Sequence, residues 1–256
     1  MADSNFPSDP PPYTDKVDES AAPPRPNLPI RKGPQPLELP ILQHLNSKRV
    51  ILASASPRRR ALLQQPEDLD KTVYGPDEYV AATARQKCVD VYSTALEASI
   101  KSVPDPSLVI AADTIVVTRD GRILEKPRSE AEHIRMLKHL RDTRMHRVLT
   151  AVTVIAPRDD ARHPGYELVS YTEETKVYFL AESEGLPDDV IEAYVKTREG
   201  ADKAGGYAVQ GVGGMLLVER IDGSIDNAVG LPVRRCMALA EKAIFRQDDE
   251  DFDEDD

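Results

Sequence analysis

The chain has 256 residues and carries 33 Lys and Arg against 44 Asp and Glu, which gives a formal net charge of −11. This acidic balance argues against duplex nucleic-acid binding, which needs a basic face, so no nucleic-acid partner is expected. Its two cysteines, Cys88 and Cys236, are too few for a disulfide framework and fit a reducing, cytoplasmic compartment. The sequence contains neither an apolar run of membrane-spanning length nor the features of a secretory signal, so no membrane partner is expected.

Both ends of the chain have compositions typical of disorder. Residues 1–45 are rich in Pro, Asp and Ser, and they lack the large apolar side chains whose burial offsets the entropy of ordering. Residues 247–256 form an acidic tail, which leaves one domain over residues 46–246. Residues 37–45 are less polar and could pack on the edge of that domain. The proline-rich part is either a plain tail or a ligand for a peptide-recognition domain.

Residues 50–63, VILASASPRRRALL, predict a short buried strand, a tight turn and a helix that begins near Pro57. Backbone N–H groups, the Ser54 hydroxyl and the guanidinium groups of Arg58 and Arg59 would then meet at one place. Such a place suits a multiply charged anion such as a triphosphate. The alternative is an ordinary strand–helix joint with solvated arginines.

The next elements are a helix with Asp77 as its N-cap, which carries Lys87, and a strand over residues 108–117. The strand is almost continuously apolar, but Asp113 and Thr114 interrupt it. A buried carboxylate is costly unless it is paired or binds a metal ion. Asp113 is therefore a functional candidate, and the alternative is an aspartate at a strand end that caps a turn.

Asp120-Gly121 predicts a hairpin turn that would return Lys126 alongside the strand of Asp113. A capping box then starts a helix at Ser129. Two strands, a helix, a glycine-rich segment and a final helix complete the predicted order, over residues 146–155, 169–180, 187–195, 197–233 and 231–245. The glycine-rich segment carries Lys203 and Gln210, and it either approaches a ligand closely or serves as a loop between strands. The order of elements predicts an α/β fold.

Several of these motifs resemble the Maf family of nucleotide pyrophosphatases. They are ASASPRRRALL at 53–63, ADTIV at 112–116, DGRILEKP at 120–127, DKAGGYAVQG at 202–211 and NAVGLP at 227–232. The resemblance implies an elongated Maf/ITPase-like mixed β-sheet with flanking helices, in two lobes around a central cleft. It also implies hydrolysis of nucleoside triphosphates to the monophosphate and pyrophosphate, as housecleaning of the nucleotide pool.

The resemblance further implies roles for individual residues. Asp113 would be the general base and the ligand of a divalent Mg or Mn ion. The substrate-binding residues would be Ser54, Arg58, Arg59, Lys87, Thr114, Lys126, Lys203 and Gln210. Among them Arg58, Thr114 and Gln210 match positions typical of the branch that acts on dTTP and UTP. Maf proteins are often homodimers, a state that this sequence does not decide.

Three departures from the family pattern keep alternatives open. Ala151 stands where glycine is usual, and TREG at 197–200 replaces T-G-E-P. The connection from Leu63 to Lys71 is short by about a strand, and Lys71 occupies the position of a glutamate that is a candidate metal ligand. The alternatives are a catalytically weak nucleotide-binding or regulatory protein on the same fold, and a 7-methyl-GTP pyrophosphatase.

Overall fold

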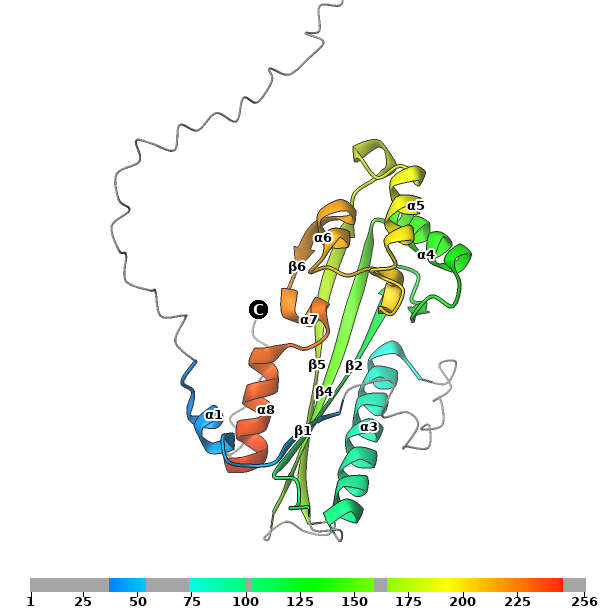
Figure 1. The fold of residues 1–256 in the computed structure, drawn as a ribbon. Helices are drawn as coiled ribbons and strands as arrows, with labels where there is room; N and C mark the ends of the chain where they lie inside the picture. Colours follow the sequence, from blue (N-terminus) through cyan, green and yellow to red (C-terminus); the bar gives the residue numbers. More distant parts are fainter. Residues whose placement is uncertain (1–36, 54–73, 100–102, 159–164, 246–256) are drawn as a thin grey trace, which may run out of the picture. The chain divides into compact units, whose positions relative to one another are not determined.

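The computed structural model describes residues 37–53, 74–99, 103–158 and 165–245, and a mixed β-sheet lies at its centre (Figure 1). The strands of the described part are β1 (Val50–Ala53), β2 (Leu108–Thr118), β3 (Ile123–Leu124), β4 (Met145–Pro157), β5 (Tyr166–Phe179) and β6 (Val218–Asp222). Their order is β1-β2-β4-β5-β6, and β3 pairs with β2. β1 runs parallel to β2, whereas the other pairings are antiparallel.

The long strands β2 and β4 form the buried centre of the sheet. Both are rich in β-branched residues, and nearly every position of β4 from His146 to Ala156 is buried or almost so. Strands covered on both faces read as continuous apolar runs, which is why the sequence predicted them well. β5 is buried mainly towards its end, from Thr175 to Phe179.

Helices cover both faces of this sheet. They are α1 (Pro40–Leu45), α3 (Pro76–Ser99), α4 (Glu130–Thr143), α5 (Asp188–Thr197), α6 (Val212–Leu217), α7 (Ile225–Val229) and α8 (Val233–Phe245), with short 3₁₀ turns η1 (Glu182–Glu184) and η2 (Ala204–Gly206). Figure 1 shows α3 and α8 on opposite sides of the strands. The buried clusters agree, because α3 packs on Ile115 and Ala151, whereas α8 packs on Leu108 and Val152.

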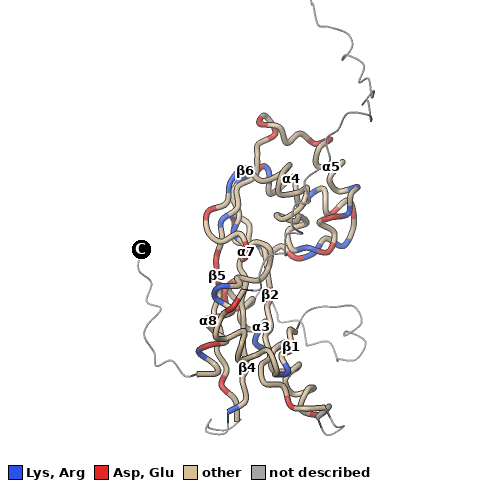
Figure 2. Tube along the Cα trace, turned by 60° about the vertical axis from the view of Figure 1, so that its left-hand side comes forward, with Lys and Arg blue, Asp and Glu red and all other residues tan. Residues whose placement is uncertain are grey.

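The α/β prediction is confirmed, as is the mixed sheet with flanking helices. The cleft between two lobes stays a prediction. Within the described part of the chain, none of the helices combines the length and hydropathy that a membrane span requires. Figure 2 shows basic and acidic residues interspersed around α4 and α5, where they form ion pairs such as Lys138–Asp188.

Two local predictions are wrong. Pro40–Leu45 lies inside the tail predicted to be disordered, but it forms α1. The expectation that residues 37–45 could pack on the edge of the domain is confirmed, because Ile41 is fully buried in the cluster that includes α8. Asp77 is not an N-cap, because α3 already begins at Pro76 and Asp77 lies in its first turn. In contrast, Ser129 is the predicted N-cap of α4 and accepts a hydrogen bond from the Glu132 N–H at 3.2 Å.

Candidate active site

Asp113 lies in the interior of β2, opposite Ala151 of β4. Its carboxylate accepts a hydrogen bond and ion pair from the Lys87 ammonium group of α3. The two side chains are 17% and 31% exposed, so the pair is half-buried but reachable from solvent. The alternative of a turn-capping aspartate at a strand end is therefore wrong. The charge in the strand is tolerated because a cation of the covering helix compensates it.

α3 positions a second contact on the same side. Tyr79 and Lys87 are eight residues apart, about two helical turns or 12 Å along the axis, and both lie on the side of α3 that meets the sheet. The Tyr79 hydroxyl donates to Glu125 Oε1 at 3.1 Å, just beyond β3. α3 therefore reaches from the Lys87–Asp113 pair to the end of the β2–β3 hairpin. The sequence predicted that this hairpin brings Lys126 alongside the strand of Asp113.

Lys126 and Lys203 both lie near the carboxylate of Asp202. Lys203 Nζ donates to Asp202 Oδ1 at 2.7 Å. The pKa of Asp202 is lowered chiefly by this hydrogen bond, and the charges of Lys203 and Lys126 lower it further. The Gly205 N–H, which donates to the Glu125 carbonyl at 3.1 Å, ties this segment to the hairpin. The structure thus brings together two of the predicted phosphate-binding lysines.

The Lys203 segment also packs on the strand of Asp113. A Cβ on Gly205, which has a φ of 73°, would lie 2.8 Å from a methyl group of Val116. Val116 is three residues beyond Asp113, which is about 10 Å along a strand, and it points to the other face. The contact therefore sets how far the Lys203 segment lies from Asp113 along β2. It does not place this segment and the Asp113 side chain on the same face of the sheet.

Thr114 points away from Asp113, as adjacent residues of a strand do. Its hydroxyl lies 3.0 Å from the Thr150 hydroxyl, and Thr150 in turn donates to the Asn227 carbonyl at 3.1 Å. Gly230 approaches Thr114 closely, since a Cβ on it would be 3.3 Å from Thr114 Oγ1. Thr114 therefore belongs with the NAVGLP segment rather than beside the Lys87–Asp113 pair.

Asn227 is a residue to which the sequence reasoning gave no role. It is fully buried, and its amide group donates to the carbonyls of Val148 and Glu173, both at 3.2 Å, and to Thr175 Oγ1 at 2.9 Å. It fixes α7 to β4 and β5 and so holds Gly230 against Thr114. The sequence signal for this role was a polar residue within the NAVGLP motif. Its hydrogen-bond partners could not be predicted, because they lie more than 50 residues away in the sequence.

The glycines of the DKAGGYAVQG segment are required by packing. A Cβ on Gly206 would lie 2.7 Å from the His133 ring, and one on Gly205 meets Val116 as above. Gln210 is exposed in the turn between η2 and α6. Packing therefore explains these two glycines. The reading of the whole segment as a loop between strands is wrong, because it contains α6, β6 and α7, and its close approach to a ligand stays a prediction.

The remaining predicted residues, Ser54, Arg58 and Arg59, lie outside the described residues, as do Lys71 and the helix predicted near Pro57. Within residues 37–53, 74–99, 103–158 and 165–245, no three His, Cys, Asp or Glu side chains are grouped as a metal site. Mg²⁺ is commonly held by one or two carboxylates together with substrate phosphates and water. Asp113 fits that role, because the bond from Lys87 goes to one carboxylate oxygen and the side chain is partly exposed.

An α/β domain with a lysine-paired carboxylate in its central strand, and further lysines around the adjoining hairpin, is suited to bind and cleave a polyphosphate. Residues 49–243 match the sequence model of a family described as Maf-like protein, so the chain belongs to the Maf family.

Curated relatives agree with this assignment. The chain is 42% identical over 232 residues to a dTTP/UTP pyrophosphatase of Schizosaccharomyces pombe, covering 85% of this chain and 92% of that protein. It is 37% identical over 204 residues to a dTTP/UTP pyrophosphatase of Thermoanaerobacter, covering 76% and 96%. It is 42% identical over 208 residues to a dTTP/UTP pyrophosphatase of Anaeromyxobacter dehalogenans, covering 77% and 95%.

The structure also explains two departures from the family pattern. Ala151 is fully buried in the apolar cluster that includes Val80 and Ala84, so α3 accommodates its methyl group beside Asp113. Arg198, at the position usually held by glycine, is the C-cap of α5 and has a left-handed φ of 62°. The first departure is a packing change, whereas the second places an unfavourable residue type at a strained position.

Proposed function

We propose that this protein is a nucleoside triphosphate pyrophosphatase, and that it hydrolyses dTTP and UTP to the monophosphate and pyrophosphate. The observation that carries the proposal is the Lys87–Asp113 pair in the centre of the sheet, within the ADTIV motif. The names of the relatives favour dTTP and UTP over 7-methyl-GTP, and they favour an enzyme over a catalytically weak binding protein.

In the proposed mechanism, Asp113 orients a water molecule and accepts its proton as the water oxygen attacks the α-phosphorus. The bond between the α-phosphorus and the bridging oxygen breaks, and pyrophosphate leaves. Lys87 holds the carboxylate in position, while Lys126 and Lys203 neutralise phosphate charge. Asp113 would also hold Mg²⁺ or Mn²⁺ together with phosphate oxygens, and this ion would supply further charge neutralisation.

Ser54, Arg58 and Arg59 complete the proposed phosphate site, and Thr114 and Gln210 are proposed to recognise the base. An amide such as Gln210 both donates and accepts hydrogen bonds, which suits the imide edge of thymine and uracil. We further propose that the enzyme acts in the cytoplasm on free nucleotides rather than on nucleic acid. A homodimer is compatible with this role.

The test is pyrophosphate release from a panel of nucleoside triphosphates with Mg²⁺ or Mn²⁺. We expect dTTP and UTP to be the best substrates and Asp113→Asn to lower kcat by about 10²- to 10⁴-fold, the usual contribution of a general base. Asp222→Asn, an exposed aspartate at the end of β6, is the matched control and should retain activity. Nucleotide binding without pyrophosphate release from any substrate would support the non-enzymatic alternative.

A further inference from the structure

The loop that carries Gln210 is closed at both ends by two residues of a different segment. At one end the Ala208 N–H donates to the Tyr194 hydroxyl at 3.1 Å. At the other end the Val212 N–H donates to Glu199 Oε1 at 2.9 Å, and the Gly213 N–H donates to Glu199 Oε2 at 2.8 Å. The two ends of the loop are therefore held by Tyr194 and by the carboxylate that follows α5.

Tyr194 and Glu199 hold the same loop and lie next to each other, because each contributes to the shifted pKa of the other. The Gly213 N–H is the main cause of a lowered pKa of Glu199, and the Val212 N–H and Tyr194 lower it further. The carboxylate therefore stays ionised at neutral pH, and two backbone N–H groups and a hydroxyl surround it. This combination is stronger than neutral hydrogen bonds of the same geometry.

The fit around this pair is tight. A Cβ on Gly211 would lie 1.9 Å from Glu199 Oε1, and a Cβ on Gly213 would lie 2.6 Å from the Tyr194 hydroxyl. The Gly211 N–H and the Gly214 N–H also donate to the Ala208 carbonyl, at 3.2 and 3.0 Å. The loop backbone is thus fixed on both sides of Gln210, while the Gln210 side chain itself is exposed.

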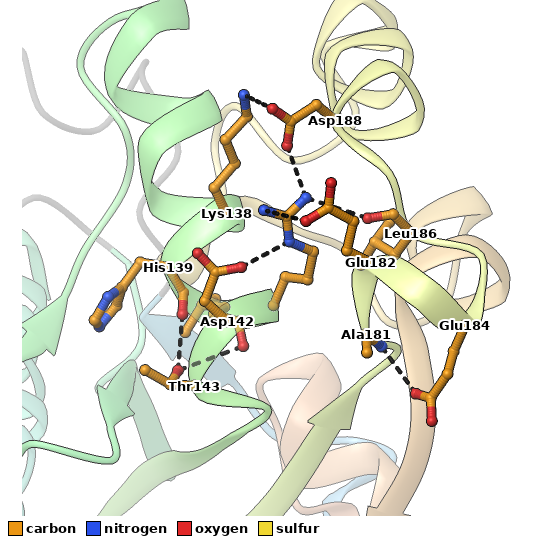
Figure 3. A network of polar contacts seen from close by, with 11 residues as sticks. Lys138, His139, Asp142, Thr143, Ala181, Glu182, Glu184, Leu186 and Asp188 are labelled. Atoms are coloured by element: carbon orange, nitrogen blue, oxygen red, sulfur yellow. Dashed lines mark hydrogen bonds and ion pairs between the residues drawn. The ribbon is translucent and has the colours of Figure 1, made fainter.

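Tyr194 is in turn held by the anchoring of α5. Asp188, in the first turn of α5, accepts hydrogen bonds from Lys138 and Arg141 of α4, both at 2.7 Å (Figure 3). The Arg141 side chain is only 7% exposed and also donates to the Leu186 carbonyl at 3.3 Å. Tyr194 itself is 1% exposed in the core cluster of this region. A chain of contacts therefore connects the Gln210 loop through α5 to α4.

We propose that Glu199 and Tyr194 are positioning residues that set the place of Gln210 and thereby the preference for uracil and thymine over cytosine. The inference rests on the proposed function for the role of Gln210. Uracil presents an N–H donor where cytosine presents an acceptor, so a fixed amide can distinguish them only if its oxygen and nitrogen cannot exchange places. A loop released at Val212 and Gly213 would let the amide turn and accept either base.

The test measures binding of α,β-methylene UTP and α,β-methylene CTP, which resist cleavage at the α–β bridge, so that base preference is separated from turnover. The variants are Glu199→Gln and Tyr194→Phe, and the control is Lys196→Gln, an exposed change on the same helix. We expect the dissociation constant of the CTP analogue divided by that of the UTP analogue to fall by at least about 10-fold in both variants. This ratio should stay unchanged in the control. Amide hydrogen exchange at Val212 and Gly213 should accelerate in Glu199→Gln.

A second readout uses the natural substrates. With UTP, the variants should raise KM more than they lower kcat, because the groups at the α-phosphate are untouched. Glu199→Asp, which keeps the charge, should restore part of the base preference. An unchanged ratio of dissociation constants in Glu199→Gln would overturn the inference, whether or not the amides exchange faster, as would a wild-type protein that binds both analogues equally. A wild-type protein that prefers the UTP analogue but releases no pyrophosphate would refute the proposed function and leave this inference standing.

Discussion

His146 should make the fold sensitive to mild acid. It is fully buried in β4, and its ring contacts the rings of Phe179 and Tyr207 at centroid distances of 5.0 and 5.5 Å. Its Nε2 lies 2.8 Å from the Tyr207 hydroxyl, and within the described residues its buried Nδ1 has no hydrogen-bond partner. Burial lowers the pKa of His146 from 6.5 to about 3, because a charged imidazole would lose its hydration there.

The magnitude follows from linkage. Between pH 6.5 and about 3 the unfolded chain binds a proton at His146 that the folded chain does not, so stability falls as pH falls through that window. At pH 5 the unfolded state gains about 2 kcal/mol relative to pH 8 from this group alone, at about 1.4 kcal/mol for each pH unit below its ordinary pKa. That loss is a large share of the stability of a typical domain.

The assay is urea unfolding of the wild type and of His146→Gln at pH 8 and pH 5. Gln can still hydrogen-bond to Tyr207 but does not titrate, and both proteins share every other acidic group. The wild type should lose about 2 kcal/mol more than the variant between the two pH values. Equal losses in the two proteins would refute the account of His146 as a buried neutral imidazole.

Two further changes test local stability. Arg198→Gly should stabilise the protein by about 1 kcal/mol, since glycine adopts the left-handed C-cap of α5 without steric cost, and a lower thermal midpoint would contradict this. Asn227→Ala should destabilise it by about 1 to 3 kcal/mol, because the carbonyls of Val148 and Glu173 lose the amide donor, while the Thr175 hydroxyl still accepts from the Ser224 N–H at 3.1 Å. An unfolding free energy within about 0.5 kcal/mol of the wild type would show that Asn227 does not hold α7 in place.

The sequence predicted most strands because burial on both faces leaves a continuous apolar run, as in β2 and β4. It also predicted that Asp113 needs a compensating partner, but not that Lys87 is that partner, since α3 and β2 meet only through tertiary packing. The helix α1 was missed for a similar reason. The propensity of a short segment next to prolines is weak, and burial of Ile41 in the cluster with α8 decides its structure.

The sequence held information on two other features of the candidate site, the facing of Asp113 and Thr114 and the role of Glu199, that motif matching did not use. Alternation along a strand already implies that Asp113 and Thr114 face opposite sides, although the family pattern treats them as one element. The role of Glu199 could not be predicted, because its partners are backbone N–H groups 13 and 14 residues away. Gly211 and Gly213 were an indirect sequence signal of the role of Glu199, because neither position has room for a Cβ beside Tyr194 and Glu199.

In the proposed reaction, water activated at Asp113 attacks the α-phosphorus of a pyrimidine nucleoside triphosphate. Hydrolysis of UTP in ¹⁸O-labelled water, followed by mass spectrometry of the products, tests it most directly. We expect one ¹⁸O atom in UMP and unlabelled pyrophosphate, with both products formed about 10²- to 10⁴-fold more slowly in Asp113→Asn. Label in pyrophosphate, or release of UDP and orthophosphate, would contradict it.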